Sequence, residues 1–177
     1  NISSFVIDTT APTVSSIYPT DNQSGYTRRG DISVTFSESI DNSSVTINTS
    51  NTSCSGTLQV SSDNFSTCVQ MSSAPAVSNS NKTFTITPLS MLSVSTLYKI
   101  SVTTGVKDIT GNNFTSQWIQ TSGFVTSSWN GTQQLGTSSE EQGHRVTVDS
   151  SNNIYVTGYT TGGCLLYTSP SPRDGLL

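Results

Sequence analysis

Residues 31–41 read DISVTFSESID, and the first half of this stretch decides the fold class. Ile32, Val34 and Phe36 stand at every second position, with Ser and Thr between them. Successive side chains of a β-strand point to opposite faces of the sheet, so this spacing predicts a strand with one buried and one solvent-exposed face.

Short apolar runs recur on both sides of this strand, and clusters of Gly, Pro, Asn and Ser separate them. That spacing is typical of a β-sandwich, in which strands follow one another every 8 to 12 residues or so. The predicted strands contain Val14 and Ile17, Val45 and Ile47, Leu58 and Val60, Val69 and Met71, Phe84 and Ile86, Tyr98 to Val102, and Phe124 with Val125. We expect Phe36, Ile86 and Ile100 to share one interior.

Composition supports an ordered all-β protein. Ser and Thr supply about a third of the 177 residues and the hydrophobic share is only 32%, so disorder is the alternative. Disordered chains, however, usually combine low hydrophobicity with high net charge, whereas this chain is 10% charged with a net charge of −4. High Thr, Val, Ile and Tyr content favours strands. The length allows one domain of ordinary size and a smaller piece.

Several classes of partner are disfavoured. The chain has seven Lys and Arg residues, and Arg28 and Arg29 are the only adjacent pair, so no basic stripe could follow a nucleic-acid backbone. No apolar run approaches the roughly 18 residues of a membrane-spanning helix. Because the chain begins at Asn1 and not at Met, we expect the true start of the protein to lie upstream.

No catalytic motif is present, so we predict a protein that is not an enzyme and carries no cofactor. The sequence has no Gly-x-Ser-x-Gly elbow, no His-Glu-x-x-His and no phosphate-binding glycine loop. His144 precedes a predicted strand as a solvated residue. Glu140 and Glu141 are adjacent and would point to opposite faces of a strand, which makes them a poor acid–base couple.

Three stretches carry a family resemblance: TAPTVSSIYPTDN, DISVTFSESID and YKISVTTGVKDITGNNF. They resemble the bacterial Ig-like domains of the SbsA type, which occur in S-layer and other surface proteins. The resemblance implies an immunoglobulin-like β-sandwich over residues 10–128 that serves as a spacer or adhesive module, usually in tandem. Residues 4–12 run from a short apolar strand into a Thr/Pro hinge, and a comparable strand ending recurs at residues 123–128, so residues 1–9 are interpreted as the end of a preceding domain and a linker.

The chain after residue 128 changes character. Val146 and Val148 face Ile154 and Val156 across a Ser/Asn turn, which predicts a hairpin. The run VDSSNNIYVTGYT resembles the bacterial β-propeller repeat of the SBBP type, so residues 129–163 are interpreted as a partial repeat. One blade cannot bury its own faces, so we expect it to be poorly ordered alone or docked on the sandwich. Residues 164–177 contain CLLYTSPSPRD, which resembles a translated sequencing-library adapter, and are interpreted as an artefactual tail.

Cys54 and Cys68 bound an insertion in the sandwich, CSGTLQVSSDNFSTC. A hairpin that turns near Ser61 and Ser62 would bring the two sulfurs together across adjacent strands, within reach of a disulfide. Two free thiols are the alternative, because Cys also packs as a small apolar residue. A disulfide implies an oxidising compartment, outside the cell or at its surface. Two Cys ligands without a nearby His do not make a metal site.

Two further candidate sites stay open. The run from Asp108 to Asn112 predicts a turn, and these two residues are a calcium candidate, although their spacing lacks the alternating oxygen ligands of a calcium loop. Tyr18, Tyr26 and Trp118 could form an exposed aromatic patch for sugar binding, or pack in the core or at a sheet edge.

Together these observations favour a non-catalytic spacer or adhesive module of an exported bacterial surface or secreted protein. Its expected partners are other domains of the same chain and surface glycans or proteins, with no nucleic acid and no insertion into a membrane. The alternative is an accessory carbohydrate-binding module of an exported enzyme whose catalytic part lies elsewhere. A cell-wall or S-layer structural subunit is a third possibility.

Overall fold

The computed structural model describes residues 7–128, 141–148 and 154–160. Its contacts divide the chain into two units, Asn1–Trp129 and Asn130–Leu177, which are treated separately below. The described residues are all-β apart from one turn of 3-10 helix, η1 (Asn42–Ser44), as the sequence predicted. Among the described residues, no helix is long and apolar enough to cross a membrane.

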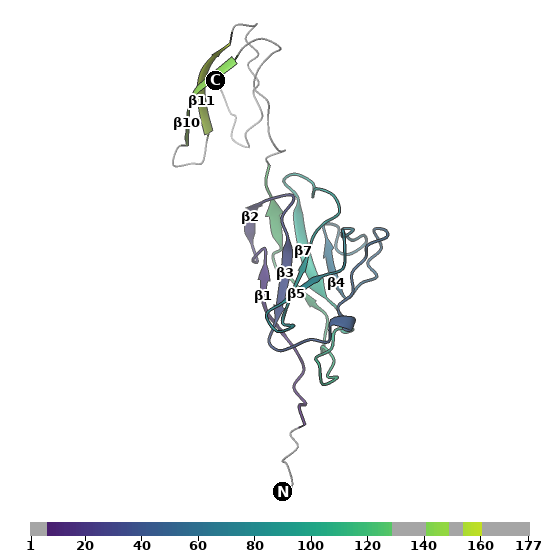
Figure 1. Ribbon diagram of the computed structural model, residues 1–177. Coiled ribbons are helices and arrows are strands. Elements are labelled where there is room, and N and C mark those ends of the chain that lie inside the picture. The colour runs from purple at the N-terminus through teal and green to yellow at the C-terminus, as the bar shows by residue number, and fades with distance from the viewer. Residues whose placement is uncertain (1–6, 129–140, 149–153, 161–177) are drawn as a thin grey trace. The chain divides into compact units, whose positions relative to one another are not determined.

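The first sheet of the sandwich has four antiparallel strands in the order β1-β3-β6-β5 (Figure 1). The stretch that decided the fold class forms β3, and its burial alternates as expected, with Ile32, Val34 and Phe36 buried. Ile32 pairs with Ile86 and Val34 with Phe84 on β6. The strands are β1 (Val14–Tyr18), β3 (Ile32–Phe36), β5 (Ala76–Ser78) and β6 (Thr83–Ile86).

The second sheet follows the order β2-β9-β7-β4, with β8 paired to β7 as well. β9 pairs in parallel with β2, and β7 pairs antiparallel with β4, β8 and β9. β1 and β2 follow each other in sequence but belong to different sheets, so the chain changes layer around the cis Tyr18–Pro19 peptide. The strands are β2 (Gln23–Tyr26), β4 (Leu58–Ser61), β7 (Leu97–Val102), β8 (Trp118–Ile119) and β9 (Phe124–Thr126).

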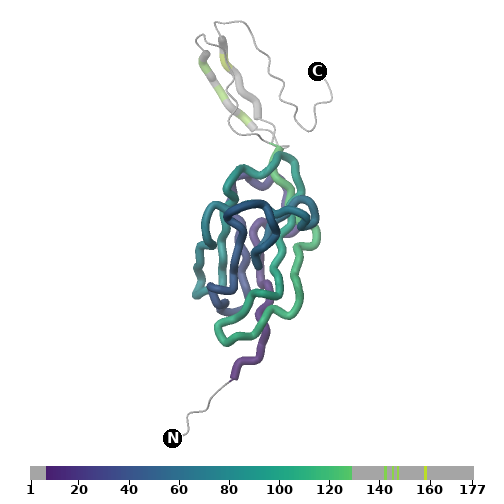
Figure 2. The backbone as a smooth tube through the Cα atoms, turned by 90° about the vertical axis from the view of Figure 1, so that its right-hand side faces the viewer, coloured from purple at the N-terminus to yellow at the C-terminus, as the bar shows by residue number. Residues whose placement is uncertain are grey.

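The core lies between the two sheets, whose backbone Figure 2 traces from the side. Phe36, Ile86 and Ile100 belong to one buried cluster, so the predicted common interior is confirmed. Aromatic rings meet edge to face within it, Phe36 with Phe84 at 5.9 Å and with Phe114 at 6.2 Å between ring centroids. Such aromatic pairs add to the free energy gained by burying apolar area.

Two predicted strands are absent from the sheets. Val45 and Ile47 lie just after η1, where Thr57 N–H donates to the carbonyl of Thr46 across a loop. A Cβ on Gly56 would come within 2.6 Å of the Ile47 Cα, so the two backbone segments pack closely here without forming a strand pair. The segment with Val69 and Met71 makes a single bridge, Met71 to Pro88.

The second unit contains the predicted hairpin. β10 (Glu141–Val148) pairs antiparallel with β11 (Ile154–Thr160), and the register sets Val146 opposite Val156 and Val148 opposite Ile154. A register shift between Gly143 and Arg145 marks a bulge.

Candidate functional site

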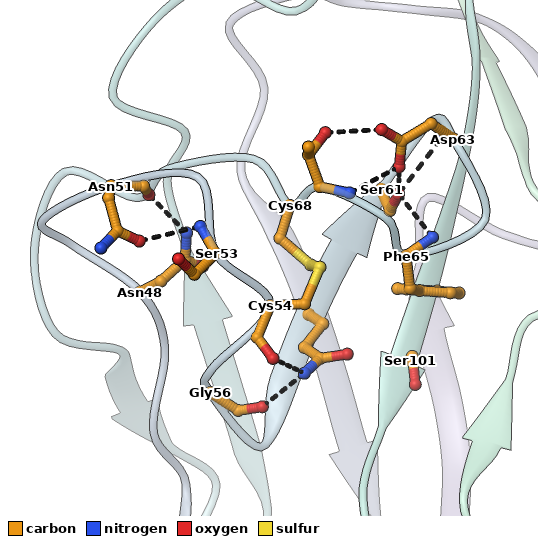
Figure 3. Close-up of a disulfide and its surroundings, with 12 residues drawn as sticks. Asn48, Asn51, Ser53, Cys54, Gly56, Ser61, Asp63, Phe65, Cys68 and Ser101 are labelled. Carbon is orange, nitrogen blue, oxygen red and sulfur yellow. Dashed lines mark hydrogen bonds between the residues drawn. A yellow bond between two sulfur atoms is a disulfide. The ribbon is translucent and has the colours of Figure 1, made fainter.

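The structure joins Cys54 and Cys68 in a disulfide, with a sulfur–sulfur distance of 2.08 Å and a Cα separation of 5.0 Å (Figure 3). The predicted hairpin geometry is wrong in detail. Cys54 lies in the loop before β4, and Cys68 N–H donates to the carbonyl of Thr52, so the cysteines are not on two paired strands. The bridge therefore ties a loop to the segment that returns from β4.

The chain turns directly after Ser61, close to the predicted position near Ser61 and Ser62. β4 ends at Ser61, and Asn64 and Phe65 then adopt left-handed backbone angles, with φ of 58° and 62°. Asp63 holds this turn: its carboxylate accepts hydrogen bonds from the Thr67 hydroxyl at 2.6 Å, the Thr67 N–H at 2.9 Å and the Ser61 hydroxyl at 2.8 Å (Figure 3). These hydrogen bonds, those from Thr67 first, lower the pKa of Asp63 to about 2.

The loop before the bridge is held by polar side chains. The buried Gln59 side chain donates from Nε2 to the carbonyls of Cys54 at 3.0 Å and Gly56 at 2.8 Å (Figure 3). Asn48, also buried, donates to the carbonyl of Asn51 at 2.7 Å. Buried polar groups must find partners, and these two find them in loop carbonyls. The disulfide thus closes a loop whose shape the hydrogen bonds also fix.

The predicted turn at Asp108 is present and well bonded. Asp108, only 1% exposed, accepts from the backbone N–H groups of Thr110 and Asn112, each at 2.8 Å. Burial opposes its ionisation, but hydrogen bonds from Asn112 and Thr110 outweigh burial and lower the pKa of its carboxyl. The amide nitrogen of Asn112 donates to Asp108 at 2.7 Å, so Asn112 meets Asp108 as a donor and not as a second oxygen ligand. Calcium binding by this pair stays a prediction.

Two other carboxylates lie close to Asp108. One oxygen from each of Asp8, Glu38 and Asp108 lies within 4.8 Å of the others. Burial, and then the negative charges of Asp8 and Asp108, raise the pKa of Glu38, and Lys82 opposes them. Sequence reasoning missed this acidic cluster because its members are far apart in the chain. The only sequence signal was that each of them stands next to a strand end or a turn.

The three aromatic residues proposed for sugar binding do not form one exposed patch. Tyr26 is 1% exposed, packs edge to face on Phe124 at 5.0 Å and donates its hydroxyl to the carbonyl of Asp31. Burial raises its pKa well above the ordinary range. Tyr18 is half exposed and packs edge to face with Tyr26, with 5.7 Å between the ring centroids, whereas Trp118 is half-buried on β8. Of the two alternatives, an exposed patch or core packing, Tyr26 therefore follows the second.

The residues weighed for catalysis fall in the second unit. Glu140 lies outside the described residues, and the side chains of Glu141 and His144 on β10 are not described. Their roles stay predictions.

The two units of the chain match two different protein families. Residues 8–126, more than half of the chain, match the family described as bacterial Ig-like domain. The chain belongs to the bacterial Ig-like domain family. Residues 130–163 match a second family, described as β-propeller repeat. Both resemblances inferred from sequence are thereby confirmed, and the sandwich described above is an Ig-like one.

Solved structures similar to this Ig-like chain come from a bacterial S-layer protein. The N-terminal part of SbsC is 17% identical with a TM-score of 0.47, over 84% of this chain and 33% of that one. The S-layer protein rSbsC(31-844) is 18% identical with a TM-score of 0.45, over 82% and 19% of the two chains. The chain thus spans a third or less of the length of these S-layer chains. No curated protein matches it.

Proposed function

We propose that the Ig-like domain is a non-catalytic spacer or adhesive module of an exported, multidomain bacterial surface protein. The observation that carries the proposal is the position of the two chain ends on the sandwich. The chain enters at one end of the domain and leaves at the other (Figure 1). A module built in this way adds its full length to a chain of domains.

Hydrogen bonds fix the two ends separately. At the entry end, Ser37 N–H, just after β3, donates to the carbonyl of Thr13. At the exit end, Ser127 N–H donates to the carbonyl of Tyr26 at 2.8 Å, and Tyr26 in turn bonds to Asp31 just before β3. The length of β3 therefore separates entry from exit.

The exit strand is placed to bear load. β9 lies parallel to β2, with Gln23 opposite Phe124 and Tyr26 opposite Thr126. Asn22 N–H donates to Gly123 and Ser127 N–H to Tyr26, which extends this contact at both ends. A pull along the chain shears these hydrogen bonds together, whereas a pull across the sheet would break them one at a time. This geometry supports a spacer that keeps its length under tension.

The disulfide supports the exported setting of the proposal. Disulfides persist in oxidising compartments and are rare in the cytosol. They also help domains with small cores, and this chain is lightly hydrophobic. Tyr18, Tyr26 and Trp118 do not form an exposed aromatic patch that the rival function, an accessory carbohydrate-binding module, could use, because Tyr26 is a core residue.

Single-molecule pulling through the two ends of the full chain tests the load-bearing exit. Ser127→Pro deletes the N–H that Ser127 donates to Tyr26, so we expect a lower unfolding force. Ser128→Pro, one residue further along and exposed, is the matched control. Equal unfolding forces for the two variants would argue against the shear-resistant exit strand.

A glycan array probed with the full chain separates the spacer from its rival. The proposal predicts no specific binding, and a specific glycan bound with millimolar or better affinity would favour the carbohydrate-binding function.

A further inference from the structure

A shallow groove lies on the exit side of the sandwich. Arg29 lines it together with residues 87–91 of the β6–β7 loop, and its volume is about 400 Å³. Leu89 and Met91, which are 54% and 45% exposed, present apolar surface there, and the Arg29 side chain is exposed beside them. None of the lining residues is acidic. The groove therefore combines apolar surface with the positive charge of Arg29, and the carboxylate of Asp31 lies beside it, bonded to Thr87.

The entry end carries the opposite character. Asp8, Glu38 and Asp108 bring three carboxylates together there, the only such group of three among the described residues. Ile109 follows Asp108 directly and is 65% exposed, and Ile7 precedes Asp8 and is 70% exposed. Lys82 lies close enough to lower the pKa of Glu38, but burial and the two aspartates outweigh it. Exposed apolar side chains thus flank a negative cluster.

The groove and the acidic cluster cannot meet within one molecule. Thr87, which lines the groove, donates its hydroxyl to Asp31 at 2.6 Å, just before β3 begins at Ile32. Glu38 stands two residues after β3 ends at Phe36. A strand rises by about 3.3 Å per residue, so the strand between them keeps the two patches roughly 15 Å or more apart. Their complementarity is available only between molecules.

We propose that a second copy of this chain docks head to tail, with its acidic entry end on the Arg29 groove of the first. Apolar side chains of Ile109 and Leu89 meet at the centre, and the carboxylates face Arg29. Opposite charges at a contact guide encounter and set orientation. The inference goes beyond the spacer role and stands or fails independently of it.

The symmetry of this contact determines which kind of assembly forms. The two surfaces are different and lie at opposite ends, so each copy that docks leaves one groove and one acidic end unoccupied. Such a heterologous contact forms open chains of molecules, or rings where the rotation between copies closes, and not two-fold symmetric dimers. The patches are small, so the association is expected to be weak and visible only at high protein concentration.

Sedimentation velocity of the full chain tests the proposal in a Cys164→Ser background, which excludes disulfide cross-links through that residue. Between about 10 µM and 1 mM protein at low salt, we expect the mean mass to rise beyond that of a dimer. At 1 M NaCl the Debye length falls to about 3 Å, and the association should weaken at least severalfold. A strictly monomeric protein, a species that stops at dimer, or insensitivity to salt would overturn the proposal.

Charge reversal identifies the two surfaces. Arg29→Glu and the double variant Asp8→Lys/Glu38→Lys should each weaken self-association roughly tenfold, because like charges then face each other. An equimolar mixture of the two variants should recover it, since each presents a surface complementary to the other. Arg145→Glu, an exposed reversal in the second unit, is the matched control and should change nothing. Failure of the mixture to recover association, with both variants folded by circular dichroism, would overturn the assignment.

Discussion

Removal of the disulfide should cost the Ig-like domain a large part of its stability. The bridge joins Cys54 and Cys68 at a sequence separation of 14. Closing a loop of about 15 residues lowers the entropy of the unfolded chain by an amount worth about 3 kcal/mol at 25 °C. Domains of this size are stable by only about 5–15 kcal/mol, so Cys54→Ser/Cys68→Ser should leave a folded but weakened protein.

We expect the double variant to lose the full entropic stabilisation, because hydrogen bonds also hold the loop in the native state. Gln59 still bonds to the carbonyls at residues 54 and 56, and the N–H of residue 68 still donates to Thr52. The folded state of the double variant should therefore keep its shape, and the change falls on the unfolded state.

Urea unfolding followed by tryptophan fluorescence measures the effect. With a slope of about 1–3 kcal/mol per molar urea, a loss of 3 kcal/mol lowers the midpoint by roughly 1–3 M. Cys164→Ser is the control and should leave the midpoint in place. If the double variant and the oxidised protein unfolded at the same urea concentration, the entropic reasoning would be refuted.

Three further substitutions test other parts of the structure. Hydrogen bonds lower the pKa of Asp63 from 3.8 to about 2, so the stability that its carboxylate contributes is present above pH 4 and is lost as the pH falls towards 2. In urea titrations over that interval, the wild-type protein should therefore lose more stability than Asp63→Asn. Gly123→Ala places a Cβ against the carbonyl oxygen of Tyr98 at φ +79°, and should lower the melting temperature more than Gly25→Ala, which has a similar φ of +68° and open space. Phe36→Ala, at 1% exposure, should cost about 3–5 kcal/mol in urea unfolding, and a loss below 1 kcal/mol would contradict its place in the core.

Alternation located the strands that bury one face. β3, β6 and β7 carry Phe36, Ile86 and Ile100 into one interior, and in each of them apolar residues stand two positions apart. The period of two is a local property that survives in the sequence whatever the strand pairs with. These elements could be predicted for that reason.

The short strands could not be found in the same way. β2 reads QSGY and buries only its last residue strongly, and β5 is exposed at all three positions. They are strands because β9 and β6 offer them hydrogen-bonding partners. The partner of β2 is β9, about a hundred residues later in the chain, so no local pattern indicates the pairing. Conversely, Val45 and Ile47 alternate but form no strand, so alternation alone does not make a sheet.

The disulfide and the acidic cluster differ in the same way, because only the first depends on residues that are close in the sequence. Cys54 and Cys68 could be paired from sequence because a short loop with two cysteines has few alternatives, although they do not lie on two paired strands as expected. The acidic cluster is built from Asp8, Glu38 and Asp108, which only the entry segment, the end of β3 and a late turn bring together. Charged residues that are far apart in the sequence form one charged surface only when the fold brings them together. A sandwich whose ends differ in charge can therefore acquire a directional contact without any motif to mark it.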